Sequence, residues 1–159
     1  MNNSSTDRIE KSIEINASPS RVWRALTDHR EFGEWFRVAI AEPFVVGKTT
    51  HGNILYPGYE HVMFEAQVVR AEPEQVFAFR WHPYAADPNV DYTAEPTTLV
   101  EFTLEPTRSG TLLRVTESGF DALPAQRRDE AYRMNDGGWA EQLNNIERHV
   151  SPNTLAIDS

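Results

Sequence analysis

Apolar and polar residues alternate along most of the chain, with the two-residue period of strands that bury one face. In the first such segment the alternation places Ile9, Ile13 and Ile15 on the same side. Proline and glycine residues, which favour turns, separate the segments. The predicted strands cover residues 8–17, 38–46, 51–56, 60–71, 75–82, 97–105 and 111–118.

Two short segments after the first predicted strand have helical spacing instead. Ser18 can cap a helix, and Pro19 suits its first turn, where the missing N–H group is not needed. Apolar residues then recur at helical spacing until about residues 28–30, and a second helical turn follows over residues 31–36. The pattern therefore predicts two short helices before the remaining strands.

The last helical pattern covers residues 124–150. Gly137 and Gly138 lie inside it, and each glycine costs a helix about 1 kcal/mol relative to alanine. We expect one continuous helix with a bend, in which small residues allow close packing on the sheet or leave room for a ligand. A break between two shorter helices is the alternative. The apolar stripe of the helix, at spacings of four, three and four, consists of Trp139, Leu143, Ile146 and Val150.

The order of these elements is a strand, two short helices, a run of antiparallel strands and a long C-terminal helix. A sheet with one apolar face must bury that face, and the long helix is the obvious cover. We therefore expect an α+β helix-grip fold, in which a curved antiparallel sheet wraps around the helix. The expected domain covers residues 8–150, between a flexible N-terminus of residues 1–7 and a polar tail of residues 151–159.

Composition narrows the range of functions. The 159 residues fit one domain, and 40% hydrophobic residues are enough for its core. A net charge of −9 argues against nucleic acid and anionic membranes as partners. The N-terminus is polar and no apolar run is long enough to span a bilayer, so we expect a cytoplasmic protein without membrane insertion.

The sequence offers few groups for covalent or metal chemistry. It contains no cysteine, which excludes disulfides and thiolate sites. Its five histidines show neither the HxH nor the HExxH spacing of zinc sites. A GxSxG motif and a glycine-rich phosphate loop are also missing. We expect neither a cofactor nor a metal.

Residues 83–96 form a long connection that is rich in proline, aspartate and alanine. Hairpin loops usually contain about two to five residues, so this segment is either a lid or a flexible insertion. Tyrosines in or beside the loops suit the mouth of a cavity, because a phenol has an apolar body and a polar tip. Ordinary turn packing is the alternative for Tyr56, Tyr59, Tyr84 and Tyr92.

Several segments resemble the START-like, or SRPBCC, superfamily. Residues 14–28, which read EINASPSRVWRALTD, are similar to its opening strand and helix. The most similar branch is the one named for the activator of heat-shock-protein-ninety ATPase, which carries a Trp soon after the first helix, here Trp35, and a strand pair like residues 68–81. Its last strand, the Gly-Phe that follows and its final helix resemble residues 110–113, residues 119–120 and the pair Gly138-Trp139.

This resemblance covers about residues 8–150. It implies a deep cavity between the curved sheet and the long helix, usually for a small apolar ligand. It does not imply a reaction, because the superfamily includes carriers, hormone receptors and cyclases. The co-chaperone that names the branch carries the similar domain as one part of a larger protein, and we expect no room for the other part in 159 residues. Direct chaperone contact is therefore not the first expectation.

Apolar residues on the inward register of the predicted elements are the candidate ligand-binding residues. Periodicity alone favours a filled core in which the rings pack on one another, whereas the resemblance favours a cavity with apolar walls and a few placed polar groups. The candidates are Trp35, Phe64, Phe77, Phe79, Trp81, Val100, Phe102, Leu113, Val115, Met134, Trp139 and Leu143.

Glu117 is the candidate catalytic residue, because it continues the inward register of Leu113 and Val115. An inward carboxylate beside aromatic rings would have a raised pKa and could act as an acid, a base or a ligand anchor. The alternative is a residue at the rim of the sheet that is solvated or paired with an arginine.

Three functions are compatible with these observations. The first is binding of a small apolar or amphipathic molecule by a carrier, sensor or sequestering module, without covalent chemistry. The second is a cyclase, hydratase or hydrolase that uses Glu117 together with a Tyr or His as acid and base. The third is a chaperone-associated, stress-related module with an exposed apolar patch. A homodimer is compatible with a sheet of this kind.

Overall fold

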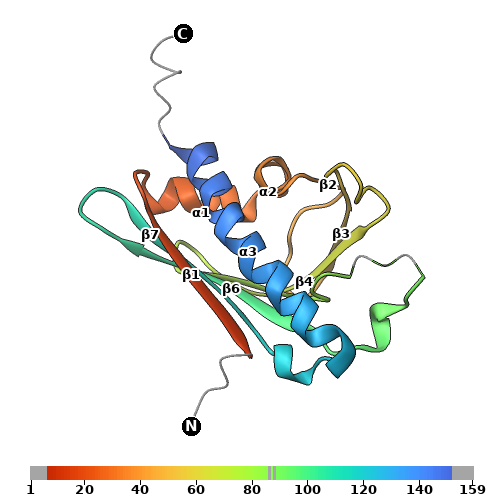
Figure 1. The fold of residues 1–159 in the computed structure, drawn as a ribbon. Coiled ribbons are helices and arrows are strands. Elements are labelled where there is room, and N and C mark those ends of the chain that lie inside the picture. Colours follow the sequence, from red (N-terminus) through yellow and green to blue (C-terminus); the bar gives the residue numbers. More distant parts are fainter. Residues whose placement is uncertain (1–6, 86, 88, 152–159) are drawn as a thin grey trace.

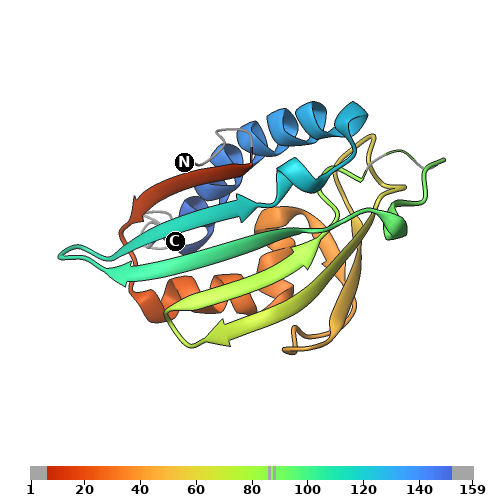
Figure 2. The same ribbon diagram turned by 90° about the horizontal axis from the view of Figure 1, so that it is seen from below.

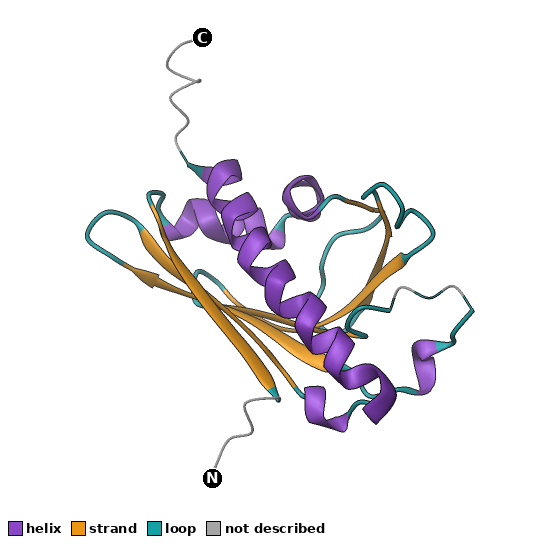
Figure 3. Cartoon of the chain, in the orientation of Figure 1, coloured by secondary structure: helices purple, strands orange, loops and turns teal. Residues whose placement is uncertain are grey.

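Figure 1 shows the computed structural model of the chain, which describes residues 7–85, 87 and 89–151. A curved sheet of seven strands carries three helices on one face, and the longest helix crosses it diagonally (Figures 1 and 3). This is the predicted α+β helix-grip arrangement. The expectations for residues 1–6 and 152–159 lie outside the described residues.

Every neighbouring pair of strands in the sheet is antiparallel. The first strand pairs with the last, so the order across the sheet is β1-β7-β6-β5-β4-β3-β2. Figure 2, seen from below, shows the sheet in front of the helices. The strands are β1 (Arg8–Ile15), β2 (Val38–Ile40), β3 (Thr49–Ile54), β4 (Met63–Glu72), β5 (Val76–Trp81), β6 (Thr98–Pro106) and β7 (Thr111–Ser118).

Four strands, β1, β2, β4 and β5, are shorter than the alternation predicts, and for β2 and β4 a local cause is visible. The strand predicted over residues 38–46 forms only at its beginning, as β2. Pro43 lacks the N–H group that a strand ladder needs, and this explains why pairing does not continue. β4 begins later than predicted, at Met63, because a turn precedes it in which the Val62 amide donates to the Tyr59 carbonyl at 2.9 Å.

The two predicted short helices are α1 (Pro19–Thr27) and α2 (His29–Phe36). Ser18 caps α1, since its hydroxyl accepts a hydrogen bond from the Arg21 amide at 3.1 Å. Asp28 ends α1 and also caps α2, where its carboxylate accepts from two backbone amides. One residue therefore serves both helices, which keeps the turn between them tight.

The helix α3 (Ala125–Val150) is continuous over 26 residues, as expected, and runs through both glycines. A Cβ atom at Gly137 or Gly138 would meet no other atom within 4 Å. The close approach of helix and sheet therefore does not require these glycines, and the space beside them is open. The predicted stripe is buried and consists of Trp139, Leu143, Ile146 and Val150.

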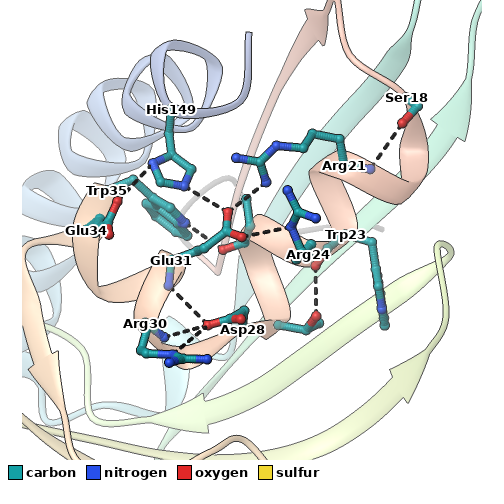
Figure 4. Close-up of polar contacts among 12 residues, drawn as sticks. Ser18, Arg21, Trp23, Arg24, Asp28, Arg30, Glu31, Glu34, Trp35 and His149 are labelled. Carbon is teal, nitrogen blue, oxygen red and sulfur yellow. Dashed lines mark hydrogen bonds and ion pairs between the residues drawn. The ribbon is translucent and has the colours of Figure 1, made fainter. Parts of the chain in front are cut away.

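One carboxylate joins the C-terminal end of α3 to the two short helices (Figure 4). Glu31 accepts hydrogen bonds from Arg21 at 2.7 Å and Arg24 at 2.8 Å, and it contacts His149 Nε2 at 2.9 Å. Burial alone would raise the pKa of Glu31, but the bonds from Arg21 and His149 and the charges of both arginines outweigh it and lower the pKa. The Glu31 carboxylate is therefore ionised at neutral pH and ties three helices together.

An aromatic cluster fills the space under α1 and α2. Phe32 is fully buried there, and the ring centres of Trp35, Phe44 and Phe79 lie 4.5, 5.2 and 6.3 Å from its own. Aromatic pairs at such distances add roughly 0.5–1.5 kcal/mol each beyond the area that they bury. This part of the interior is a packed core, as the filled-core alternative predicts.

Candidate functional site

A partly enclosed pocket of about 430 Å³ lies beside this packed cluster. Its walls come from the end of α2, the connection between β3 and β4, the ends of β4 and β5, residues 84, 85, 87 and 90–93, and the middle of α3. In Figure 1 the connections lie together on the side of α3 that faces β3. The aromatic side chains that line the pocket are Phe36, Tyr56, Tyr59, Phe64, Trp81, Tyr84 and Tyr92.

Two of the predicted ligand-binding residues, Phe64 and Trp81, line this pocket. Met134, at 39% exposed, lies on the outer side of α3 and does not line it. The pocket is lined by residues of α3 and of the ends of β4 and β5, and aromatic rings of α2 pack against Phe102 and Trp139 beside it. The remaining candidates are buried in the packed core, namely Trp35, Phe77, Phe79, Val100, Phe102, Leu113, Val115, Trp139 and Leu143.

All four loop tyrosines line the pocket, so they do more than pack turns. A side-chain hydrogen bond between Tyr59 and Tyr84 joins the β3–β4 connection to the segment that follows β5. Burial and this bond raise the pKa of Tyr84, so its phenol stays neutral and keeps its proton for hydrogen bonding. The mouth of the pocket is therefore lined by polar tips on apolar bodies.

Arg127 holds both ends of the segment 83–96 against α3. Its guanidinium donates to the Glu95 carboxylate at 2.8 Å and to two backbone carbonyls of the segment at 2.8 and 3.1 Å. It also lies 4.7 Å from the centre of the Tyr92 ring. The side chains of Arg127 and Glu95 are only 14% and 15% exposed, so solvent screens this pair less than an ordinary surface pair. The segment is thus anchored as one wall of the pocket.

Glu117 faces inward from β7 and is fully buried, which contradicts the alternative of a solvated residue at the rim. Its Oε1 atom accepts hydrogen bonds from Trp139 Nε1 at 2.7 Å and Asn135 Nδ2 at 3.0 Å. Its Oε2 atom accepts from Trp81 Nε1 at 2.8 Å and Thr98 Oγ1 at 2.5 Å. Four donors thus satisfy the four lone-pair positions of an ionised carboxylate.

Burial raises the pKa of Glu117, and the bonds from Thr98, Trp81, Trp139 and Asn135 oppose that effect without cancelling it. The raised pKa of Glu117 agrees with the prediction made from the strand register. The partners are two indoles, a hydroxyl and an amide, so none of them is an acid or base near neutral pH. Glu117 itself does not line the pocket, and it reaches the site through Trp81 and Asn135, which do.

Three polar residues of this region were missed by sequence reasoning. Asn135 lies four residues before Trp139, so helical spacing places both on one face of α3, and this signal could have found it. Thr98 lies opposite Trp81 in the pairing of β5 with β6, which is known only once the register is known. Gln142 lines the pocket although it lies beside the apolar stripe.

The polar lining of the pocket consists of hydroxyl, amide, imidazole and carboxylate groups. Among the described residues, no group of three His, Cys, Asp or Glu side chains is placed to hold a metal ion. Within the same part of the chain, no helix combines the length and apolar character needed to cross a bilayer.

Solved structures with this fold are known, although no curated protein matches the chain. Protein MLL2253 from Mesorhizobium loti is 28% identical, with a TM-score of 0.71 over 89% of this chain and 95% of that one. A protein from Arthrobacter aurescens is 15% identical, with a TM-score of 0.74 over 93% and 89% of the two chains. Aha1 from Colwellia psychrerythraea, solved as a dimer, is 21% identical, with a TM-score of 0.68 over 91% and 96%.

A family model described as "Activator of Hsp90 ATPase homolog 1-like protein" matches residues 16–151. The match extends from the end of β1 to the end of α3, so it includes Glu117 and every residue that lines the pocket. It confirms the branch of the START-like superfamily that the sequence resembles. The chain belongs to the family of activator of Hsp90 ATPase homolog 1-like proteins.

Proposed function

We propose that this protein binds a small apolar or amphipathic molecule in the pocket beside its aromatic core, as a carrier, sensor or sequestering module. The observation that carries this proposal is a pocket of about 430 Å³ lined by seven aromatic side chains. Small-molecule sites typically have volumes of about 300–1,000 Å³, with apolar walls and a few polar groups that orient the ligand. Burial of apolar surface at roughly 25 cal/mol per Å² would supply the affinity.

The surroundings of Glu117 favour this binding role over an enzymatic one. Acid–base catalysis needs a titratable group that can reach the substrate, usually with a second group to receive or return the proton. Glu117 lies behind the wall of the pocket, and its four partners are two indoles, a hydroxyl and an amide. A binding pocket needs no reacting group, and it uses Trp81 and Asn135 as fixed parts of the wall.

A substitution that fills the pocket tests the proposal. Ala85 lines the pocket, so the Ala85→Trp variant places an indole inside it. Ala140 is on the exposed face of α3, so Ala140→Trp is the matched control. Native mass spectrometry with a panel of lipids and polyketides should detect a ligand on the unmodified protein and on the control, with at least about tenfold weaker binding to Ala85→Trp.

Equal binding by the two variants would contradict the proposed site. The absence of any bound molecule from the whole panel, together with a crystal structure in which side chains close the pocket, would contradict the binding role itself. Circular dichroism of both variants establishes that the comparison is made between folded proteins.

A further inference from the structure

The polar part of the pocket wall carries carboxylates beside the imidazoles of His61 and His82. Among its described lining residues, Glu65, Asp87 and Asp91 are carboxylates, and none is a lysine or an arginine. The hydroxyl and the amide of Thr93 donate to Asp91 and hold the pKa of that carboxyl below its ordinary value, so the group stays charged. The carboxylates lie at the exposed rim, where they act on the charge of an approaching ligand rather than as buried anchors.

The deeper part of the wall presents a hydrogen-bond acceptor. Asn135 lines the pocket, and its Nδ2 atom donates to Glu117 Oε1 at 3.0 Å. Both oxygens of Glu117 already act as acceptors, because each binds an indole N–H group that can only donate. The amide nitrogen is therefore committed to Glu117, and the Oδ1 atom of Asn135 remains to accept a proton from a ligand.

The aromatic walls suit a cation as well as an apolar body. The face of an aromatic ring attracts a cation within about 6 Å of its centre. Two rings of the lining already show this geometry, because Arg37 lies 5.2 Å from the centre of the Tyr56 ring and Arg127 lies 4.7 Å from that of Tyr92. Neither arginine is among the lining residues, and Trp81, in the wall itself, offers a further π face to a ligand.

We infer that the pocket selects a protonated amine carried on an aromatic or aliphatic body, an inference that rests on the binding role proposed above. The ammonium group donates to Asn135 Oδ1 and lies against the rings, while the rim carboxylates and the net charge of −9 favour its approach over that of an anion. Glu117 acts as a positioning residue, because it orients Asn135 and Trp81 without touching the ligand.

Three probes that share one apolar body test the inference. Phenylbutylamine, phenylbutanol and phenylpentanoate carry the same phenylbutyl body and differ only in a cationic, a neutral and an anionic end. Isothermal titration of the unmodified protein at low ionic strength should show the amine binding at least about tenfold more tightly than the carboxylate, and more tightly than the alcohol. Added salt should reduce the preference for the amine over the carboxylate, because it screens the exposed rim.

A pair of variants assigns the preference to the pocket. Asp91→Asn removes one charge from the rim, and Glu105→Gln removes the same charge from an exposed site on β6 that does not line the pocket. The ratio of amine to alcohol affinity should fall about two- to fivefold in Asp91→Asn and stay unchanged in Glu105→Gln. Equal reductions in both variants would mean that net charge alone sets the preference, and would overturn the assignment to the pocket.

The outcomes separate this inference from the proposed function. If the alcohol or the carboxylate binds as tightly as the amine, the pocket binds small molecules but does not select cations, and the inference is overturned alone. If neutral lipids of the panel bind and none of the three probes does, the inference is again overturned alone. If neither the probes nor the panel bind, the proposed function fails with it.

Discussion

Glu117 is a buried carboxylate whose hydrogen bonds join β5, β6, β7 and α3. A carboxylate without partners would cost several kcal/mol in such a place, but here each oxygen accepts two bonds. Two of the donors, the indoles of Trp81 and Trp139, also stack on each other with their ring centres 5.8 Å apart. One carboxyl side chain therefore fixes part of the core and part of the pocket wall at the same time.

Replacing Glu117 with glutamine should destabilise the protein by about 1–3 kcal/mol. The side chain keeps its shape, but one acceptor oxygen becomes an NH₂ group. This NH₂ group faces either the donors of Trp139 and Asn135 or the donors of Trp81 and Thr98. Urea unfolding, followed by the fluorescence of the buried tryptophans, measures the change.

Glu105→Gln is the control, because Glu105 is exposed. This substitution should change the free energy of unfolding by less than about 0.5 kcal/mol. If Glu117→Gln proves as stable as this control, the four hydrogen bonds do not constrain the core in the way described.

The pH dependence of stability should have opposite signs for Glu117 and Glu31. The folded pKa of Glu117 lies above the ordinary value of 4.5, so its contribution to stability is present below that value and is lost as pH rises through the folded pKa. The folded pKa of Glu31 lies below 4.5, so its contribution is present above that value and is lost as pH falls through the folded pKa. Urea unfolding of the protein, Glu117→Gln and Glu31→Gln across acid and neutral pH measures both.

The difference in unfolding free energy between the protein and Glu117→Gln should decrease with rising pH, whereas the difference from Glu31→Gln should decrease with falling pH in the acid range. Parallel pH profiles for all three proteins would contradict both assignments.

The inward direction of Glu117 was predictable from the sequence, because strand alternation extends from Leu113 through Val115 to it. The partners of Glu117 were less accessible. Asn135 was not singled out from the sequence, and Thr98 belongs to a strand whose register with Trp81 depends on the segment between them. The alternation of a strand therefore predicts which face of the sheet a side chain lies on, but not which residues it contacts.

At the scale of elements, the alternation predicted all seven strands and the helical spacing predicted all three helices. The predicted ends of the strands were wrong where a local feature interrupts the alternation, as Pro43 does after β2. The extent of the cavity was not predictable, because periodicity does not tell how much of the interior the rings of Phe32, Trp35 and Phe36 in α2 fill.

Alanine at Gly137 or Gly138 should stabilise α3. Both positions are helical, their φ angles are not positive, and a Cβ atom would meet nothing within 4 Å. Each substitution should therefore raise the free energy of unfolding by about 0.4–1 kcal/mol. Thermal unfolding measures this gain, and a loss of stability in both variants would show that the helix needs glycine here.

Arg127 should control the mobility of residues 83–96. Arg127→Gln removes the ion pair with Glu95 and weakens the hydrogen bonds to two carbonyls of the segment, so hydrogen exchange within it should become at least about tenfold faster. Arg133→Gln, on the exposed face of the same helix, is the control. Unchanged exchange in Arg127→Gln would mean that other contacts hold the segment.

At the scale of the whole molecule, the fold separates two tasks. Aromatic rings under α1 and α2 form a packed core, while the connections after β3 and β5 enclose a pocket beside it. The Glu117 network lies between them and contacts both. In the proposed binding role, a ligand would enter this pocket without opening the core.

The crystal structure of a complex with the tightest ligand of the panel tests this account most directly. We predict ligand density in the pocket between Trp81, Tyr84 and Asn135, with the rings of Phe79 and Phe102 in their present contact. Density at another surface, or a ligand that pushes those two rings apart and occupies the core under α3, would contradict it.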